Sequence, residues 1–256
     1  MRTLRILFFG LALLALRATV TPAAAPAPET FDAKGVKLKY YVAGKGEPVV
    51  LVHGLHSSAQ MNWMTNGVFE ALSQNHQVIG LDLPGHGGSD KPDKDEAYGE
   101  AMVEDVVLLL DHLKVKKAHV VGYSMGGMVA VKLMAKHPDR VLSGTLGGMG
   151  WLKEGGGLQK VWEKMGARDM GKTPAACTRG IARLALSADE LKAIKNPTVI
   201  IVGDRDPVRK MYVDPLLTVR KDWPVIEIEG AGHINCIMKK EFKDHIAKWL
   251  AKQTKK

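Results

Sequence analysis

Cysteine is scarce in this chain. Its two cysteines, Cys177 and Cys236, allow at most one disulfide. They could pair in an oxidising compartment, although the sequence does not show whether their Cα atoms come within about 7 Å of each other. The sequence also lacks internal repeats and long blocks of charge. Its 256 residues, 46% of them hydrophobic, fit one globular α/β domain with a full core and exclude a disordered chain.

The N-terminus lacks an apolar stretch long enough to span a bilayer. Residues 6–16 are apolar, follow Arg2 and Arg5, and precede small residues at 23–25. This pattern predicts a signal peptide over residues 1–25, and residues 26–30 are interpreted as a linker to a domain at 31–256. Prolines directly after the cleavage region leave an uncleaved membrane anchor as the alternative. In both cases we expect the domain at 31–256 to lie outside the cytoplasm. With cleavage we expect an exported protein, periplasmic or secreted, with no stable membrane span in the mature chain, and without cleavage an anchored one.

Clustered arginines interleaved with aromatic residues are also missing. The net charge is +9, and removal of residues 1–25 takes away three arginines and no acid, which leaves +6. Many lysines lie at 239–256, where helical spacing puts Phe242, Ile246, Trp249 and Leu250 on one face. This segment is interpreted as an amphipathic helix docked on the sheet, and we expect no nucleic-acid partner.

Short apolar runs alternate with helical patterns along the rest of the chain. Strands are predicted at 36–42, 48–52, 78–82, 118–122, 141–146, 198–203 and 225–228, and helices at 97–113, 125–137 and the C-terminus. This alternation predicts an α/β fold with a mostly parallel sheet and helices on both faces. The first run is expected to be an edge strand of a hairpin.

Residues 147–194 break this alternation. They are helix-like, rich in glycine at their start and contain no clear strand, and they lie between two predicted core strands. We therefore expect a small helical cap over the carboxyl ends of the strands. Trp151, Leu152 and Trp162 are the candidates for substrate binding in an apolar pocket beneath it, with Met165 and Met170 as further apolar candidates. The alternative is that these side chains only pack the cap onto the core.

The most informative motif is Gly122-Tyr123-Ser124-Met125-Gly126. It follows a predicted buried strand and precedes a predicted helix. In this context a G-x-S-x-G motif holds its serine on a tight turn with the hydroxyl exposed, and the flanking glycines give the turn room. The helix that follows points its N-terminus at the reaction centre and favours negative charge there. Ser124 is therefore the predicted nucleophile.

A serine hydroxyl needs a base, and the base needs a third group that orients it. His233 follows the last predicted strand, in a loop of small residues, and is the predicted base. Asp206 follows the strand at 198–203 and is the predicted acid. Asp204 is its rival, although it is more typical of a residue that turns the loop or pairs with Arg205. The order Ser, Asp, His is the one that strand-to-helix serine hydrolases require.

An oxyanion intermediate needs two backbone N–H donors. Met125 follows the serine, and Leu55 lies in the loop after an early strand, so their N–H groups are the predicted oxyanion hole.

Three histidines, His53, His56 and His86, raise the question of a metal site. The first is expected to order its loop by hydrogen bonds, and no acid or cysteine completes a ligand set. No metal is predicted. Asp82 and Asp90 are interpreted as turn and capping residues.

Together the motifs resemble the α/β-hydrolase fold superfamily over about residues 31–252. The resemblance rests on His53-Gly54-Leu55, on Gly122-Tyr123-Ser124-Met125-Gly126-Gly127, on Gly203-Asp204-Arg205-Asp206 and on Gly230-Ala231-Gly232-His233. It implies an eight-stranded sheet and serine-dependent hydrolysis of a small-molecule ester without a cofactor. The family also includes lactonases, amidases, C–C bond hydrolases, perhydrolases and acyltransferases, and a non-catalytic binding protein is a further alternative. The short cap departs from the family pattern and indicates a more open site.

Overall fold

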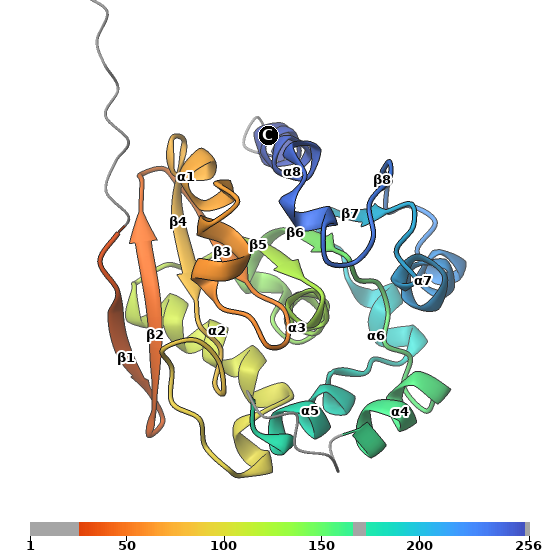
Figure 1. The fold of residues 1–256 in the computed structure, drawn as a ribbon, viewed down its shortest axis with the longest axis horizontal. Helices are drawn as coiled ribbons and strands as arrows, with labels where there is room; N and C mark the ends of the chain where they lie inside the picture. Colours follow the sequence, from red (N-terminus) through yellow and green to blue (C-terminus); the bar gives the residue numbers. More distant parts are fainter. Residues whose placement is uncertain (1–25, 166–172, 254–256) are drawn as a thin grey trace, which may run out of the picture.

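The computed structural model describes residues 26–165 and 173–253. An eight-stranded sheet runs through the molecule in the order β1-β2-β4-β3-β5-β6-β7-β8 (Figure 1). Pairs β1/β2 and β2/β4 are antiparallel, and the remaining pairs are parallel. The strands are β1 (Glu29–Ala33), β2 (Val36–Ala43), β3 (Glu47–Val52), β4 (His76–Leu81), β5 (Ala118–Tyr123), β6 (Val141–Gly147), β7 (Thr198–Gly203) and β8 (Val225–Ile228). The predicted α/β class and the mostly parallel sheet are confirmed.

The central strands are apolar on both faces. All residues of β5 and β7 are buried, as expected for parallel strands covered by helices on each side. The carboxyl ends of β3, β5 and β7 therefore meet at one edge of the sheet, where ligands of such folds bind.

The N-terminal hairpin differs from the prediction in two ways. β2 is an interior strand, because it pairs with both β1 and β4, and the edge strand is β1. Since β1 begins at Glu29, the linker predicted over residues 26–30 ends two residues early. The turn between the strands has Lys34 at φ 54° and Gly35 at φ 88°, the left-handed pair that two-residue hairpins favour.

Helices cover both faces of this sheet. In the view of Figure 1, α1 and α8 lie above it, while α2, α3 and α6 lie below. The α-helices are α1 (Val68–Ser73), α2 (Glu100–His112), α3 (Met125–Lys136), α4 (Gly157–Met165), α5 (Ala175–Ile181), α6 (Ala188–Ala193), α7 (Asp214–Val219) and α8 (Lys240–Gln253). Short helical turns are η1 (Gln60–Met64), η2 (Asp95–Ala97), η3 (Pro138–Arg140), η4 (Ala182–Leu184), η5 (Arg209–Val213) and η6 (Cys236–Met238). The helices α1 and α7 were not predicted.

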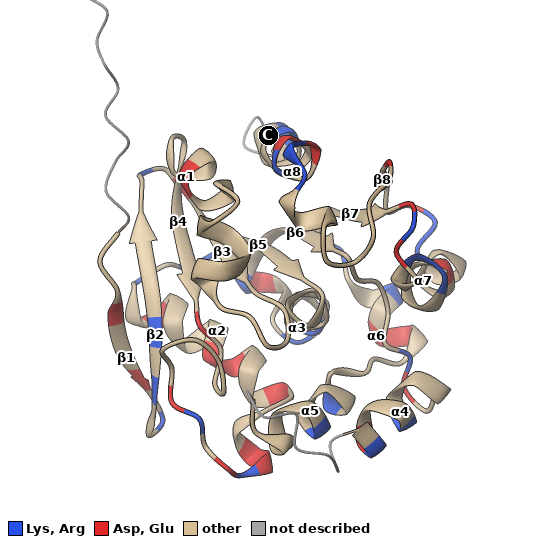
Figure 2. Cartoon of the chain, viewed as in Figure 1, with Lys and Arg blue, Asp and Glu red and all other residues tan. Residues whose placement is uncertain are grey.

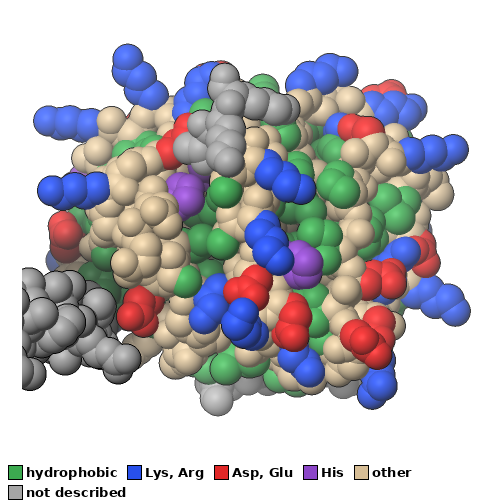
Figure 3. All heavy atoms as spheres, turned by 90° about the horizontal axis from the view of Figure 1, so that it is seen from above, with side chains coloured by type: hydrophobic (Ala, Val, Ile, Leu, Met, Phe, Trp, Pro, Cys, Tyr) green, Lys and Arg blue, Asp and Glu red, His purple; other side chains and the backbone are tan. Residues whose placement is uncertain are grey.

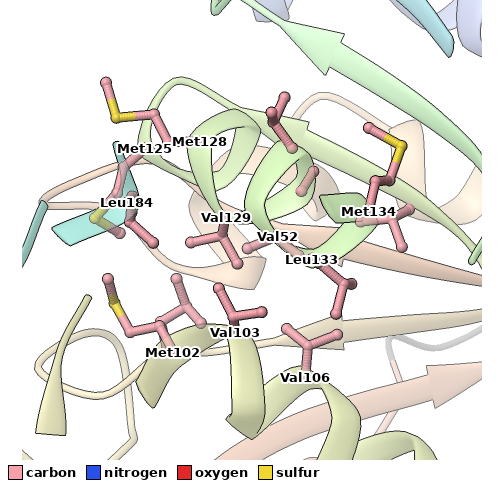
Figure 4. Packing of buried hydrophobic residues seen from close by; sticks show 14 of the residues in the cluster. Val52, Met102, Val103, Val106, Met125, Met128, Val129, Leu133, Met134 and Leu184 are labelled. Atoms are coloured by element: carbon pink, nitrogen blue, oxygen red, sulfur yellow. The ribbon is translucent and has the colours of Figure 1, made fainter. Parts of the chain in front are cut away.

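Two apolar cores flank the sheet. One packs α2 and α3 against the lower face, where Val129 and Leu133 of α3 meet Val103 and Val106 of α2 (Figure 4). The other packs α1 and α8 against the upper face through residues such as Phe242. Because α3 begins directly after Ser124, its burial fixes the position of the predicted nucleophile.

The insertion after β6 is helical, as predicted, but α6 does not belong to a cap. This helix contacts α3 and α7 of the core layer. The helices α4 and α5 pack on each other, and α5 carries basic residues near the acidic segment before α2 (Figure 2). There Arg179 pairs with Asp95 at 2.7 Å. The cap proper therefore ends before α6.

Helix α8 confirms the interpretation of the C-terminal segment. Phe242, Ile246 and Leu250 are buried, whereas Trp249 is only partly buried against the same core. The face around α8 carries lysines side by side with acidic residues (Figure 3). Within residues 26–165 and 173–253 no helix combines the length and apolarity that a membrane crossing requires. The predicted signal segment, residues 1–25, lies outside the described residues.

Candidate active site

Ser124 occupies a strained turn between β5 and α3. Its backbone has φ 53° and ψ −118°, a conformation that L-residues rarely adopt and that is often found at functional sites. Its N–H donates to the Gly147 carbonyl at 2.8 Å. The turn tolerates only glycine at its flanks, because a Cβ on Gly122 would lie 2.0 Å from the Gly126 oxygen and one on Gly126 would lie 2.0 Å from the Val52 oxygen. The turn thus has the form that the motif predicts.

The structure brings Ser124, His233 and Asp206 together. His233 Nε2 lies 2.9 Å from Ser124 Oγ, and its Nδ1 lies 2.8 Å from Asp206 Oδ2. The other carboxylate oxygen of Asp206 accepts the N–H of Val208 at 2.9 Å. The Asp206 side chain is fully buried, whereas that of His233 is 35% exposed. This is the hydrogen-bond chain in which a serine can lose its proton to an oriented imidazole.

Asp204 takes a different position. Its Oδ1 accepts the N–H of Ala231 at 3.1 Å, which ties the loop after β7 to the loop that carries His233. Backbone hydrogen bonds from Gly230 and Ala231 hold the pKa of Asp204 below its ordinary value. Asp204 therefore fastens the histidine loop, and the carboxylate that contacts His233 belongs to Asp206.

The predicted oxyanion donors lie beside the serine. Met125 is the first residue of α3, and the loop that carries Leu55 passes so close that a Cβ on Gly54 would lie 3.3 Å from Ser124 Cβ. Within the described ranges, neither the Leu55 nor the Met125 N–H donates to a protein acceptor. The oxyanion hole stays a prediction.

Asn62 is a positioning residue that the sequence analysis missed. Its Oδ1 accepts the N–H of Gly54 at 2.8 Å, and this contact holds the loop of Leu55 near the serine. Asn62 lies in η1, a short π-helical turn for which the sequence carries no periodic signal.

His53 orders its loop, as expected, and is not a base for Ser124. Its Nε2 accepts the N–H of Leu83 at 3.0 Å and its Nδ1 donates to the Gly54 carbonyl at 2.8 Å. Burial lowers the pKa of His53 to about 4, so the ring is neutral at neutral pH.

Asp82 and Asp90 accept backbone N–H groups, most of them from distant segments of the chain. Asp82 accepts the N–H groups of Ala59 and Gly88 at 2.7 and 2.9 Å, and Asp90 accepts that of Lys37 at 2.8 Å. In the described part of the chain no group of three histidine, cysteine or acidic side chains has the arrangement of a metal site.

The three predicted substrate residues pack within the molecule. The Trp151 indole is 4% exposed and donates to the Leu186 carbonyl at 2.8 Å, and Leu152 is 2% exposed. Trp162 is only partly buried, and its indole N–H donates to the Tyr212 hydroxyl at 3.0 Å. Of the three, Trp162 alone keeps a partly exposed side chain. Met170 lies outside the described residues.

Both cysteines are buried free thiols. Cys177 lies in α5 and Cys236 in η6, on different cores of the molecule. The possible disulfide is therefore not formed.

Known proteins share this architecture. A model of the alpha/beta hydrolase fold family matches residues 47–180. The chain belongs to the α/β-hydrolase fold family. The matched residues run from β3 through the Ser124 turn into α5.

Relatives of this α/β hydrolase differ in activity. It is 42% identical over 127 residues to the dihydrolipoyllysine-residue acetyltransferase component of an acetoin cleaving system from Pseudomonas putida, covering 47% of this chain and 32% of that protein. It is 32% identical over 136 residues to 2-hydroxymuconate semialdehyde hydrolase from Pseudomonas sp. (strain CF600), covering 51% and 47%. The matches therefore span about a third to a half of these proteins.

A solved thermophilic esterase from Thermogutta terrifontis shares the fold. Its TM-score is 0.75 at 24% identity, over 90% of this chain and 99% of the esterase. At this identity the likeness concerns the fold alone.

Proposed function

We propose that this chain is an exported serine hydrolase that cleaves carboxylic esters through an acyl-enzyme on Ser124. The observation that carries the proposal is the hydrogen-bond chain from Ser124 through His233 to the buried Asp206, with contacts of 2.9 and 2.8 Å. A positive-φ serine between a strand and a helix supports the same assignment, because the strain exposes its hydroxyl.

The reaction begins when Ser124 Oγ attacks the ester carbonyl and His233 Nε2 accepts the hydroxyl proton. Asp206 keeps the Nδ1 proton on the side away from the serine and stabilises the imidazolium that forms. His233 then returns the proton to the leaving alcohol, and the acyl-enzyme remains. In the second half, His233 takes a proton from a water molecule while the water oxygen adds to the acyl carbon. The bond from that carbon to Ser124 Oγ then breaks, and His233 returns the proton to Oγ.

The negative charge on the carbonyl oxygen is stabilised by the N–H groups of Leu55 and Met125. Their positions beside Ser124 and at the N-terminus of α3 support this role. Each such donor typically contributes a factor of about 10²–10³ in rate.

The first experiment compares hydrolysis of p-nitrophenyl esters, from acetyl to palmitoyl, by wild type and Ser124→Ala. We expect the substitution to lower kcat by about 10⁶-fold, because the nucleophile is removed. The chain length with the highest rate gives the size of the acyl pocket. Ser73→Ala, which alters an exposed hydroxyl at the end of α1, is the matched control and keeps the wild-type rate. Ester hydrolysis retained by Ser124→Ala would overturn the proposal.

A second candidate is cleavage of a C–C bond by the same triad. The similarity to 2-hydroxymuconate semialdehyde hydrolase favours it. If 2-hydroxymuconate semialdehyde is consumed faster than any ester, and in a Ser124-dependent way, this candidate replaces ester hydrolysis.

Export is proposed from the N-terminal pattern of arginines, apolar residues and alanines in residues 1–25. Expression of the full chain in a bacterium, fractionation and mass measurement of its N-terminus test this. A cytoplasmic protein of full length would reject export, and a full-length membrane-bound form would favour the uncleaved anchor.

A further inference from the structure

Tyr123, which directly precedes the predicted nucleophile, contacts the loop of the predicted base. It ends β5 and is 4% exposed. Its hydroxyl donates to the carbonyl oxygen of His233 at 2.5 Å, and the centroids of the two rings lie 5.7 Å apart. One buried side chain thus connects the strand of the nucleophile with the loop of the base.

The Tyr123 ring lies in a pocket that the fold keeps open for it. A Cβ on Gly147 would lie 2.8 Å from Tyr123 Cδ2, and one on Gly148 would lie 3.0 Å from Tyr123 Cζ. Phe242 of α8 packs edge-on against the ring, with centroids 5.5 Å apart. The glycines at the start of the insertion, which drew attention in the sequence, therefore make room for Tyr123.

The backbone of His233 depends on this contact. The neighbouring loop residues have anchors of their own, since Asp204 accepts the Ala231 N–H and Asn235 accepts the Gly232 N–H at 2.7 Å. In the part of the chain that the structure describes, the Tyr123 hydroxyl makes the one hydrogen bond to the main chain of His233. The imidazole nitrogens are hydrogen-bonded to Ser124 and Asp206.

We propose that Tyr123 is a positioning residue whose hydroxyl fixes the His233 backbone, so that Nε2 stays directed at Ser124 while Nδ1 stays on Asp206. The proposal rests on the proposed acyl-enzyme mechanism and deepens it. A displacement of a catalytic group by about 1 Å can cost about 10²-fold in rate, so a backbone anchor next to the base has a measurable effect.

The hydroxyl is suited to be a permanent donor. Burial raises the pKa of Tyr123 far above its ordinary value of 10, and the nearby Cys236 thiol and Asp206 carboxylate act in the same direction. The phenol therefore stays protonated over the whole pH range in which an esterase works, and its donation to His233 does not titrate.

Tyr123→Phe tests the proposal because it removes the hydroxyl and keeps the ring. Tyr98→Phe is the matched control, since Tyr98 is 1% exposed and its hydroxyl likewise donates to one carbonyl, that of Pro92 at 2.7 Å. Three quantities are compared for both variants: kcat and KM for the best p-nitrophenyl ester, the thermal midpoint, and the low-field proton NMR signal of His233 Nδ1–H.

We expect Tyr123→Phe to lower kcat about tenfold or more with KM unchanged, and to broaden or abolish the low-field signal. Tyr98→Phe should lose similar thermal stability and keep both kcat and the signal. Full kcat with an intact signal in Tyr123→Phe would overturn the proposal. An equal loss of kcat in both variants would also overturn it, because general loosening would then explain the effect.

The NMR signal separates this inference from the proposed function. If wild type hydrolyses no ester and does not react with a fluorophosphonate at Ser124, the proposed function fails. The comparison of the low-field signal still decides the positioning role, since a signal present in wild type and lost in Tyr123→Phe supports it and a signal present in both rejects it.

Discussion

Asp204 and Asp206 lie two positions apart and have different roles in the loop after β7. Asp206 is buried against His233, whereas Asp204 accepts a backbone N–H from the histidine loop. The sequence ranks them but does not separate them, because both follow the same strand. What distinguishes them is the direction of each side chain, which is set by the turn of the loop.

Asp206→Asn should lower kcat by about 10³–10⁴-fold with little change in KM, because an amide cannot hold the reactive tautomer of His233. Asp204→Asn is the control, since its amide oxygen can still accept the Ala231 N–H, and it should keep a rate close to wild type. Steady-state kinetics on a p-nitrophenyl ester, with circular dichroism to check folding, measure both. A larger loss in Asp204→Asn would reassign the acid.

At the scale of elements, Lys132 connects the nucleophile helix with the end of the insertion. Its side chain is 7% exposed, and its Nζ lies 3.2 Å from Glu100 of α2 and 3.5 Å from Glu190 of α6. It also donates to the Ala185 carbonyl at 3.0 Å. One buried charge thus joins α2, α3 and α6 beneath the cap.

Lys132→Met should lower the free energy of unfolding by about 1–3 kcal/mol, because the buried Ala185 carbonyl loses its donor. Glu100 and Glu190 lose their cation too, but their side chains are 45% and 42% exposed and stay hydrated. Lys136→Met is the control on the same helix. Lys136 is 33% exposed and pairs with Glu100 and Glu104, so its loss should cost less than about 1 kcal/mol. Urea unfolding measures both, and equal losses would show that burial of Lys132 adds nothing.

The sequence predicts best those elements whose own residues show the full apolar pattern of a strand or a helix. β5 and β7 are mostly apolar, and α2 shows helical spacing, so each appears close to its predicted range. The helix α1 is short and begins after a left-handed Gly67, so tertiary packing and not local pattern defines it. The predicted linker overlaps the start of β1, because Glu29 and Thr30 are polar, exposed residues that give no apolar strand signal.

The sequence predicts the three residues of the Ser-Asp-His triad but not the residues that hold them in place. Ser124, Asp206 and His233 follow strand ends, and parallel strands bring their carboxyl ends to one edge. The contacts of Asn62 and Tyr123 depend on how distant segments pack, and 110 residues separate Tyr123 from His233. No local pattern carries that information.

At the scale of the whole molecule, buried ionisable groups oppose each other. Burial lowers the pKa of His53 to about 4 and that of His86 to about 3. Burial also raises the pKa of Asp105 on α2 to about 7. Between about pH 5 and 6.5 each of these groups has a different charge in the folded chain than in the unfolded chain. The free energy of unfolding therefore depends on pH in this range.

The two histidines favour stability that rises with pH. At pH 5 they are neutral in the folded chain and protonated in the unfolded chain, so unfolding takes up protons and acid destabilises the fold. Asp105 acts in the opposite direction, because it is protonated when folded and ionised when unfolded. His119, whose pKa burial also lowers, adds to the effect of the other histidines. The histidines therefore outweigh Asp105.

We expect the free energy of unfolding to rise from pH 5 to pH 6.5, with a net slope up to about 1.4 kcal/mol per pH unit for each proton by which the histidines exceed Asp105. Asp105→Asn should steepen this slope, because it removes the opposing group, while His86→Gln should flatten it. Urea unfolding at four pH values in this range measures all three proteins, and the opposite signs of the two variants serve as mutual controls. A wild-type stability that falls as the pH rises would show that Asp105 dominates. Identical slopes in all three proteins would show that neither Asp105 nor His86 changes its protonation on unfolding.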